Sequence, residues 1–229
     1  MTMNEADAAS RLVLWFSPGF PTGAFSFSHG LEWAVEEGDV AGAANLTAWI
    51  AALIEQGGGW SDAVLVALSH RAALAGEEKA MAEFAELALA LQPSRERRLE
   101  TGVQGDAFLK AVETGWPSEI LARFRRAWPG TCALPIAVGT AGAGAGLPLG
   151  PLLSAFLSAF AANLVSAAIR LAPIGQSDGL RVLSALGPVI ARCAARAAEA
   201  GPGDLGTLAL RSDIASMRHE TQFTRLFRS

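Results

Sequence analysis

The sequence LPLGPLLSAFLSAFAANLVSAAI fills residues 147–169 and contains no charged side chain. It ends a longer uncharged run that lies between Arg126 and Arg170. A helix that crosses a bilayer needs about 20 consecutive apolar residues, so the length of this stretch raises the question of a membrane span. The order of large and small side chains within the stretch answers that question.

From residue 151 onwards the large apolar side chains recur with the i, i+1, i+4, i+5, i+8 spacing of one helical stripe. This stripe consists of Leu152, Leu153, Phe156, Leu157, Phe160, Leu164, Val165 and Ile169. The opposite face carries Ser154, Ser158, Ala162, Asn163 and Ser166. A lipid-facing helix has no reason to separate large from small residues, whereas a helix between two neighbours fills a core with one face and admits a close backbone at the other. The pattern predicts a buried bundle helix, and a membrane-associated protein is the alternative.

The composition indicates a folded domain. Hydrophobic residues make up 51% of the 229 residues and charged residues only 17%, which excludes a disordered chain because so much apolar surface must be buried. The formal net charge of −4 gives no overall basic field for binding nucleic acid. The first residues lack the basic flank and apolar core of a secretory signal, and two cysteines are too few for a disulfide scaffold. We expect one cytoplasmic domain over residues 1–229, with residues 1–10 disordered.

Helical periods separated by glycine, proline and short polar residues fill the chain, and no alternating Val/Ile/Thr run of strand length occurs. The sequence therefore predicts an all-α, single-domain bundle of about ten helices. Ser61 or Asp62 can cap one helix, and Ser94 can cap another after the break at Pro93. The predicted helices cover residues 29–37, 45–56, 61–75, 77–91, 94–112, 117–128, 134–145, 151–169, 177–186, 188–200 and 211–218.

The sequence lacks the motifs of a catalytic or metal site. A nucleotide-binding loop needs Gly-Lys-Ser/Thr after a glycine turn, and the chain has no Gly-Lys pair. The glycine-rich run at residues 139–146 is interpreted as a close-packed helix end. The histidines lack zinc spacing, no nucleophile stands beside a base, and Cys132 and Cys193 are interpreted as small buried hydrophobes. We expect no enzyme activity, no metal and no cofactor; the alternative is an enzyme or cofactor-binding helical bundle with a buried pocket.

The segment SPGFPTGAFSFSHGLE at residues 17–32 is too rich in proline and glycine for a helix. Irregular segments often carry function, and aromatic side chains contribute much of the contact energy in protein interfaces. Its phenylalanines therefore indicate either a partner interface or a loop that closes one end of the bundle. Glu32 falls in the first turn of the helix that follows, where a carboxylate is favourable.

The tail MRHETQFTRLFRS at residues 217–229 carries three large apolar side chains, Phe223, Leu226 and Phe227. On a helix these three residues would share one face, surrounded by Arg218, Arg225 and Arg228. Apolar residues at a chain end are usually docked. They dock either onto the same chain or onto another protein, in which case the tail orders on binding.

Three segments of the chain resemble signatures of the urease accessory protein UreF family. They are FSFSHGLEWAVEEG at residues 25–38, APIGQSD at residues 172–178 and RHETQFTRLFRS at residues 218–229. The segments occur in the family's order and span the chain, whereas residues 60–130 match only as helices. Phe27 and Phe223 stand where the family often has tyrosine, so any hydroxyl hydrogen bond at those positions is lost.

The resemblance implies an all-α protein, usually a dimer, that catalyses nothing itself. Family members join UreD, called UreH in some bacteria, and the GTPase UreG in a complex that delivers nickel to apo-urease. The resemblance further implies that this chain controls the GTPase step of UreG. Nickel would pass through the assembled complex and GTP would be bound by UreG, so the chain itself would hold neither a metal nor a cofactor.

The resemblance also implies roles for particular residues. It places His29, Glu32 and Arg170 at a UreG-facing or channel surface, and it gives Gln176 the role of holding a turn by backbone hydrogen bonds. It implies that the tail, residues 217–229, is ordered by a UreD-type partner. The tail residues expected to dock on that partner are His219, Glu220, Phe223, Arg225, Leu226, Phe227 and Arg228.

Overall fold

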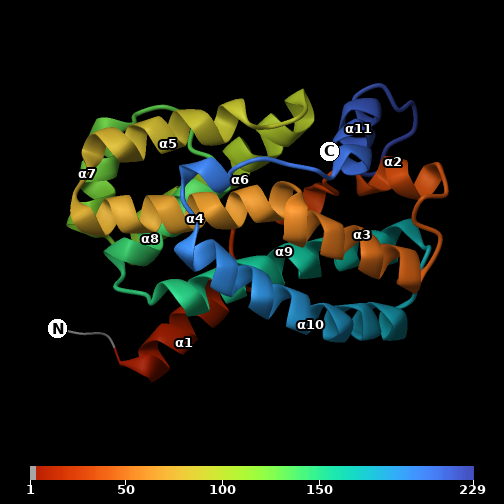
Figure 1. The fold of residues 1–229 in the computed structure, drawn as a ribbon, viewed down its shortest axis with the longest axis horizontal. Coiled ribbons are helices and arrows are strands. Elements are labelled where there is room, and N and C mark those ends of the chain that lie inside the picture. Colours follow the sequence, from red (N-terminus) through yellow and green to blue (C-terminus); the bar gives the residue numbers. More distant parts are fainter. Residues whose placement is uncertain (1–3) are drawn as a thin grey trace.

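The computed structural model describes residues 4–229, and this range folds into helices without any strand (Figure 1). The predicted all-α, single-domain bundle is confirmed. Two short 3₁₀ turns, Ala24–Ser26 and Pro202–Asp204, lie in the connections. The α-helices are α1 (Glu5–Trp15), α2 (Leu31–Glu36), α3 (Ala43–Gln56), α4 (Gly58–Ala75), α5 (Glu78–Ala90), α6 (Arg95–Gly115), α7 (Glu119–Ala127), α8 (Leu134–Gly144), α9 (Leu149–Leu171), α10 (Gln176–Glu199) and α11 (Leu210–His219).

Helix α9, formed by the uncharged stretch, packs against α10, α4, α3 and α2. Six residues of its large apolar stripe are buried, namely Leu152, Leu153, Phe156, Leu157, Leu164 and Val165. By length and composition α9 alone among residues 4–229 could cross a membrane, but half of its most apolar window is buried inside the fold. Protein therefore covers the apolar face, as the separation of large from small side chains predicts.

The start of the chain differs from the prediction. The sequence analysis predicts disorder over residues 1–10; residues 1–3 lie outside the described residues, but residues 5–10 form the first part of α1. The Asn4 side chain caps this helix by accepting a hydrogen bond from the Asp7 amide at 2.8 Å. Trp15 at the end of α1 is buried, with its ring against Phe108 at a centroid distance of 5.5 Å. Tertiary packing of the apolar side of α1, which includes Ala8 and Trp15, thus orders a segment whose polar start indicates a loose end.

Two other helix boundaries were predicted wrongly. The helices predicted over residues 177–186 and 188–200 form the single helix α10, with Pro188 inside it. Pro188 is exposed, so its ring and the lost backbone hydrogen bond face solvent while the opposite side of α10 packs on α3 and α9. Helix α4 begins at Gly58, so Ser61 and Asp62 lie inside it instead of capping it. Ser94 does cap α6, accepting a hydrogen bond from the Arg97 amide at 3.1 Å.

The glycine-rich run confirms its interpretation as a site of close packing. Within residues 4–229 the contact between α8 and α4 is more extensive than the contact between any other two helices. A Cβ atom on Gly139 would lie 2.0 Å from Ser69 Oγ and 2.4 Å from the carbonyl oxygen of Val66. A Cβ atom on Gly142 would lie 2.4 Å from a methyl carbon of Leu152. Gly139 lets α8 approach α4 at backbone distance, and Gly142 makes room for the Leu152 side chain of α9.

Gly139→Ala is expected to lower the free energy of unfolding by about 2 kcal/mol, because the new methyl group overlaps both Ser69 and the α4 backbone. Gly115→Ala is the matched control, since a Cβ atom there would meet nothing within 4 Å. The control should change stability by less than about 0.5 kcal/mol, or raise it slightly through helix propensity. Urea unfolding measures both values, and equal midpoints for the two variants would contradict the packing argument.

Candidate functional site

The segment around α2 and the C-terminal tail meet at one end of the bundle, away from α1. Figure 1 shows α11 beside α2, with the C-terminal end of the described chain returning to the same place. After α11 the tail turns back and runs without further helix through residues 220–229. Segments that the sequence places at opposite ends of the chain therefore form a single site.

The Glu32 carboxylate is the central acceptor of this site. It accepts hydrogen bonds from the backbone amides of Leu226 at 2.6 Å and Phe227 at 3.0 Å. It also lies 3.0 Å from Nε2 of His219. Glu32 belongs to α2, whereas all three donors belong to the far end of the chain. The carboxylate therefore fixes the path of the tail through its backbone.

His219 lies between two carboxylates and is fully buried. While its Nε2 atom faces Glu32, its Nδ1 atom lies 2.5 Å from Oε2 of Glu96 at the start of α6. The second oxygen of Glu96 accepts a hydrogen bond from Arg225 at 2.6 Å. Glu96 thus links the end of α11 to the middle of the tail, and the two nitrogens of His219 face different helices.

Ser229 holds the last described part of the tail. Its backbone oxygen accepts a hydrogen bond from the Ser28 amide at 2.8 Å and another from the Ser28 hydroxyl. Its hydroxyl group donates to Oε2 of Glu100 at 2.5 Å. We call the set Glu32, Glu96, Glu100, His219 and Ser229 the tail anchor.

Glu100 is a buried carboxylate with a buried counter-charge. Arg97 forms an ion pair with it one turn earlier on α6, and Gln104 donates to its other oxygen at 3.3 Å. Burial opposes ionisation of Glu100, but Arg97 and the nearby His29 outweigh this effect and hold the pKa of Glu100 well below its usual range. The carboxylate is therefore charged at neutral pH and can accept the hydrogen bond from Ser229.

A glycine allows α11 to reach the anchor. Gly30 has a φ of 75°, and a Cβ atom there would lie 2.8 Å from the Cα atom of Ser216 on α11. His29, just before it, also has a positive φ of 60°. The chain thus turns through a left-handed pair directly before α2, and this turn brings Glu32 within reach of His219.

Arg170, at the end of α9, lies between two aromatic rings. Its guanidinium carbon is 3.7 Å from the centroid of Phe25 and 4.3 Å from that of Phe227. It also donates a hydrogen bond to the carbonyl oxygen of Phe25 at 2.6 Å. Such stacked cations are attracted by the ring faces. Arg170 therefore ties the irregular N-terminal segment to the tail.

The structure shows where these site residues lie. His29 and Glu32 are 5% and 6% exposed, so neither faces outside solvent, and His29 lines a cavity. The tail packs on its own chain, and its ordering by a UreD-type partner stays a prediction. Gln176 is the exposed first residue of α10, and its side chain makes no hydrogen bond within residues 4–229.

The tail presents its apolar residues in two directions, because it is not helical beyond α11. Phe227 is buried, whereas Phe223 is fully exposed and Leu226 is 62% exposed. The prediction of one shared apolar face is therefore wrong. The remaining tail residues make polar or ring contacts: Glu220 accepts from the Arg95 amide at 2.7 Å, and the exposed Arg228 lies 5.5 Å from the centroid of the Phe27 ring.

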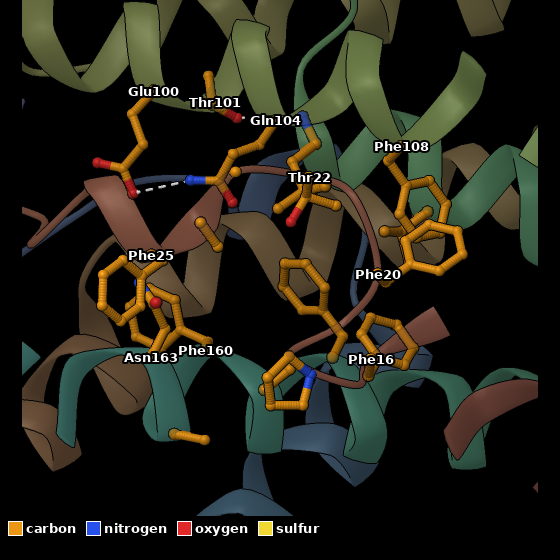
Figure 2. Close-up of a pocket in the computed structure, with 18 of the residues that line it drawn as sticks. Phe16, Phe20, Thr22, Phe25, Glu100, Thr101, Gln104, Phe108, Phe160 and Asn163 are labelled. Atoms are coloured by element: carbon orange, nitrogen blue, oxygen red, sulfur yellow. Dashed lines mark hydrogen bonds between the residues drawn. The ribbon is translucent and has the colours of Figure 1, made fainter. Parts of the chain in front are cut away.

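A cavity of about 330 Å³ lies behind the anchor (Figure 2). Glu100 and Gln104 lie toward one end of it, near Phe25, Phe160 and Asn163. The other end is apolar and is lined by Phe16, Phe20 and Phe108. His29 also lines the cavity; burial and the Arg97 charge lower the pKa of His29 to about 4, so its ring is neutral at pH 7.

Asp62 on α4 also lines this cavity, and the sequence analysis considered it only as a helix cap. Its side chain is buried, and its carboxyl group makes no hydrogen bond or ion pair within residues 4–229. Burial raises the pKa of Asp62 to about 6, although the Arg97 charge opposes the rise. An acid without a partner is unusual at such burial, because desolvation disfavours its charged form.

Glu96, Glu100 and Ser229 were not among the site residues predicted from the sequence. Both glutamates stand on a predicted helix among other charges, where they resemble solvent-facing residues. In the structure Glu100 is 5% exposed, and helix periodicity carries no signal for this burial. The only available indication was the i, i+3 spacing of Arg97 and Glu100, which suits an ion pair on a helix.

No cluster of three or more His, Cys, Asp or Glu side chains in the described part of the chain could hold a metal ion. His219 illustrates the reason, since its two nitrogens face carboxylates on opposite sides of the ring. Cys132 and Cys193 are both buried and free, as expected of small hydrophobes, and burial raises the pKa of the Cys193 thiol to about 11.

Fold and site together define an all-helical protein in which buried carboxylates of α2 and α6 hold the C-terminal tail through its backbone and a histidine. The chain belongs to the UreF family: the family model described as UreF matches residues 40–187. A protein of Rhodopseudomonas palustris (strain BisB5) named urease accessory protein UreF is 49% identical over 229 residues, which cover 100% of this chain and 94% of that protein. Proteins with the same name from Methylobacterium radiotolerans and Bradyrhizobium diazoefficiens are 48% identical over 225 residues (98% of each chain) and 47% identical over 229 residues (100% and 95%).

Glu32→Gln is expected to release the tail. The glutamine side chain has only one acceptor oxygen, and its NH₂ group would face one of the backbone N–H donors of Leu226 and Phe227. Hydrogen exchange at these two amides should accelerate by at least about tenfold, since a charge-assisted bond contributes about 1.5–3 kcal/mol. Glu86→Gln, an exposed carboxylate on α5, is the control and should leave both exchange rates unchanged. Unchanged protection in Glu32→Gln would show that the carboxylate does not fix the tail.

Asp62→Asn is expected to alter the pH dependence of stability. The wild-type carboxyl ionises near pH 3.8 in the unfolded chain, but its pKa in the folded chain is about 6, so stability is lost as the pH rises between these values. As the pH rises from about 4 to about 7.5, the variant should therefore gain about 2 kcal/mol relative to wild type. Denaturant unfolding at both pH values measures this change. Asp178→Asn, which removes an exposed ion pair with Arg181, is the control and should change the pH dependence of stability much less. An equal change in both variants would show that Asp62 is not the source of the pH dependence.

Proposed function

We propose that this chain is an accessory protein of urease maturation that performs no catalysis itself. Its family membership and the names of its relatives support this role, since the relatives are called accessory proteins of urease. In the proposed assembly the chain, as a homodimer in the cytoplasm, joins UreD (UreH) and the GTPase UreG and serves apo-urease. Nickel is the cargo of that assembly, and GTP is bound by UreG.

The geometry of the tail is the observation that carries the proposal. Glu32 holds the backbone at Leu226 and Phe227, so the tail lies in one fixed path on the surface. That path leaves the Phe223 side chain fully exposed and the Leu226 side chain largely exposed. A fixed aromatic residue loses little entropy on binding, which makes it an effective contact for another protein. We assign this surface to the UreD-type partner.

Phe25 extends the same surface from the N-terminal side. It is 67% exposed, and Arg170 stacks beneath it and donates to its carbonyl oxygen. We assign the surface around Phe25 and Arg170 to contact with UreG, through which the chain would influence the GTPase step. His29 and Glu32 would act there indirectly, because they are buried and position the segments that carry the exposed residues.

The double variant Phe223→Ala/Leu226→Ala is expected to keep the fold but to weaken co-purification with a UreD-type partner by at least about tenfold, as loss of two exposed anchors should cost about 1.4 kcal/mol or more. Leu208→Ala/Leu210→Ala is the matched control, because both leucines are exposed and lie at the end of α11 that is remote from the tail, Leu208 just before the helix and Leu210 as its first residue. The control should retain the partner. Equal retention by both double variants would contradict the docking role of the tail.

The same variants test the role in urease maturation when nickel loading of urease is measured in cells. The tail variant should lower urease activity in proportion to the loss of partner, and the control should not. Full activity with a partner that no longer co-purifies would refute the proposed dependence of maturation on this contact.

A further inference from the structure

The cavity behind the tail anchor has no role in the proposed assembly, yet it is large and chemically divided. Its volume of about 330 Å³ lies within the usual range for small-ligand pockets. Figure 2 shows phenylalanine rings entering it from both sides, with polar side chains of α6 along one wall. Such a pocket is what the alternative of a bundle with an internal binding site requires.

Among the acids of the polar wall, Asp62 alone has no partner within residues 4–229, while Nη1 of Arg97 is ion-paired with Glu100 but makes no well-aligned hydrogen bond. Glu100 is satisfied by Arg97, Gln104 and Ser229. Asp62 is 7% exposed, lines the same cavity and lies near enough to Glu100 and Arg97 for both charges to act on it. Buried polar groups are nearly always hydrogen-bonded, so an acid that faces a cavity without a donor indicates a donor supplied from outside the chain.

The charges in the wall indicate which kind of donor fits. Arg97 neutralises Glu100, and His29 is uncharged at neutral pH. An ionised Asp62 therefore leaves one uncompensated negative charge, which a cation would balance and an anion would oppose. The ring of Phe160 lines the same cavity, 5.0 Å from the His29 ring between centroids, and aromatic rings also attract cations.

From these observations we infer that the cavity binds a small organic cation, with an ammonium group paired to Asp62 and an apolar body among Phe16, Phe20 and Phe108. The apolar body accounts for the second end of the cavity, where no polar partner is offered. The ligand class is thus an alkylamine in which a short chain joins the ammonium group to an apolar ring. This inference does not depend on the proposed role in urease maturation.

Three probes that share one body test the choice of head group: 4-phenylbutylamine, 4-phenylbutanol and 4-phenylbutanoate. Titration calorimetry of the full chain at about pH 7.5 should show binding of the amine at least about tenfold tighter than binding of the alcohol, and weaker still for the acid. Equal affinities for the three probes, or no binding of the amine, would overturn the inference.

Two variants locate the binding. Asp62→Asn should weaken binding of the amine by at least about tenfold and leave binding of the alcohol nearly unchanged. Asp178→Asn, outside the cavity, is the control and should change neither affinity. Ala159→Phe, which places a ring in the cavity from α9, should weaken all three probes. Retention of full amine affinity in Asp62→Asn would exclude the proposed ion pair.

The wild-type chain offers a test that needs no variant. The pKa of Asp62 is raised to about 6, and the amine stays charged well above this pH. Amine affinity should therefore fall as the pH drops from about 7.5 to about 5, while alcohol affinity stays constant. Over this interval the other groups facing Asp62 do not interfere: Glu100 and Arg97 remain charged, and His29 remains neutral. An amine affinity that does not vary with pH would overturn the inference.

Discussion

The hydrogen bonds from the tail to the Glu32 carboxylate are the interaction on which one end of the molecule depends. A carboxylate buried to this degree is costly unless donors surround it, and two backbone amides with a histidine supply them. The donors come from residues 219–227, so without the tail both Glu32 and Glu96 would lose the partners that make their burial tolerable. The tail is therefore a structural element of the bundle before it is a contact for any other protein.

The close approach of α11 to α2 and the position of Arg170 both serve to hold the tail in this place. Helix α11 must approach α2 at backbone distance for His219 to reach Glu32, and Gly30 permits this approach against Ser216. Arg170 then closes the arrangement from α9 by stacking on Phe25 and Phe227. Gly30 and Phe25 thus meet residues of α11, α9 and the tail, so two of the three family-like segments come together here, and Arg170 stands just before the third.

The sequence was sufficient for the local part of the fold. Helix α9 could be predicted because its stripe of large residues is a property of neighbouring positions, and the same holds for the Ser94 cap. Helix α10 could not, because whether Pro188 breaks a helix depends on which side faces solvent. The resemblance drew attention to Glu32 and His219, but their contact joins residues 187 positions apart, which no periodicity encodes. Glu96 and Glu100 resembled ordinary surface charges for the same reason.

Glu100 connects the two sites that the structure reveals. One of its oxygens receives the Ser229 hydroxyl from the tail, and the same side chain forms part of the cavity wall beside Asp62. Its charge is balanced by Arg97 and by these donors, so removing the tail would change the electrostatics of the cavity as well as the surface. The coupling between the tail and the cavity is reciprocal. A ligand in the cavity that favours one arrangement of Glu100 therefore also favours the tail position that goes with that arrangement. Buried charge thus makes the exposed contact surface and the interior pocket parts of one electrostatic unit.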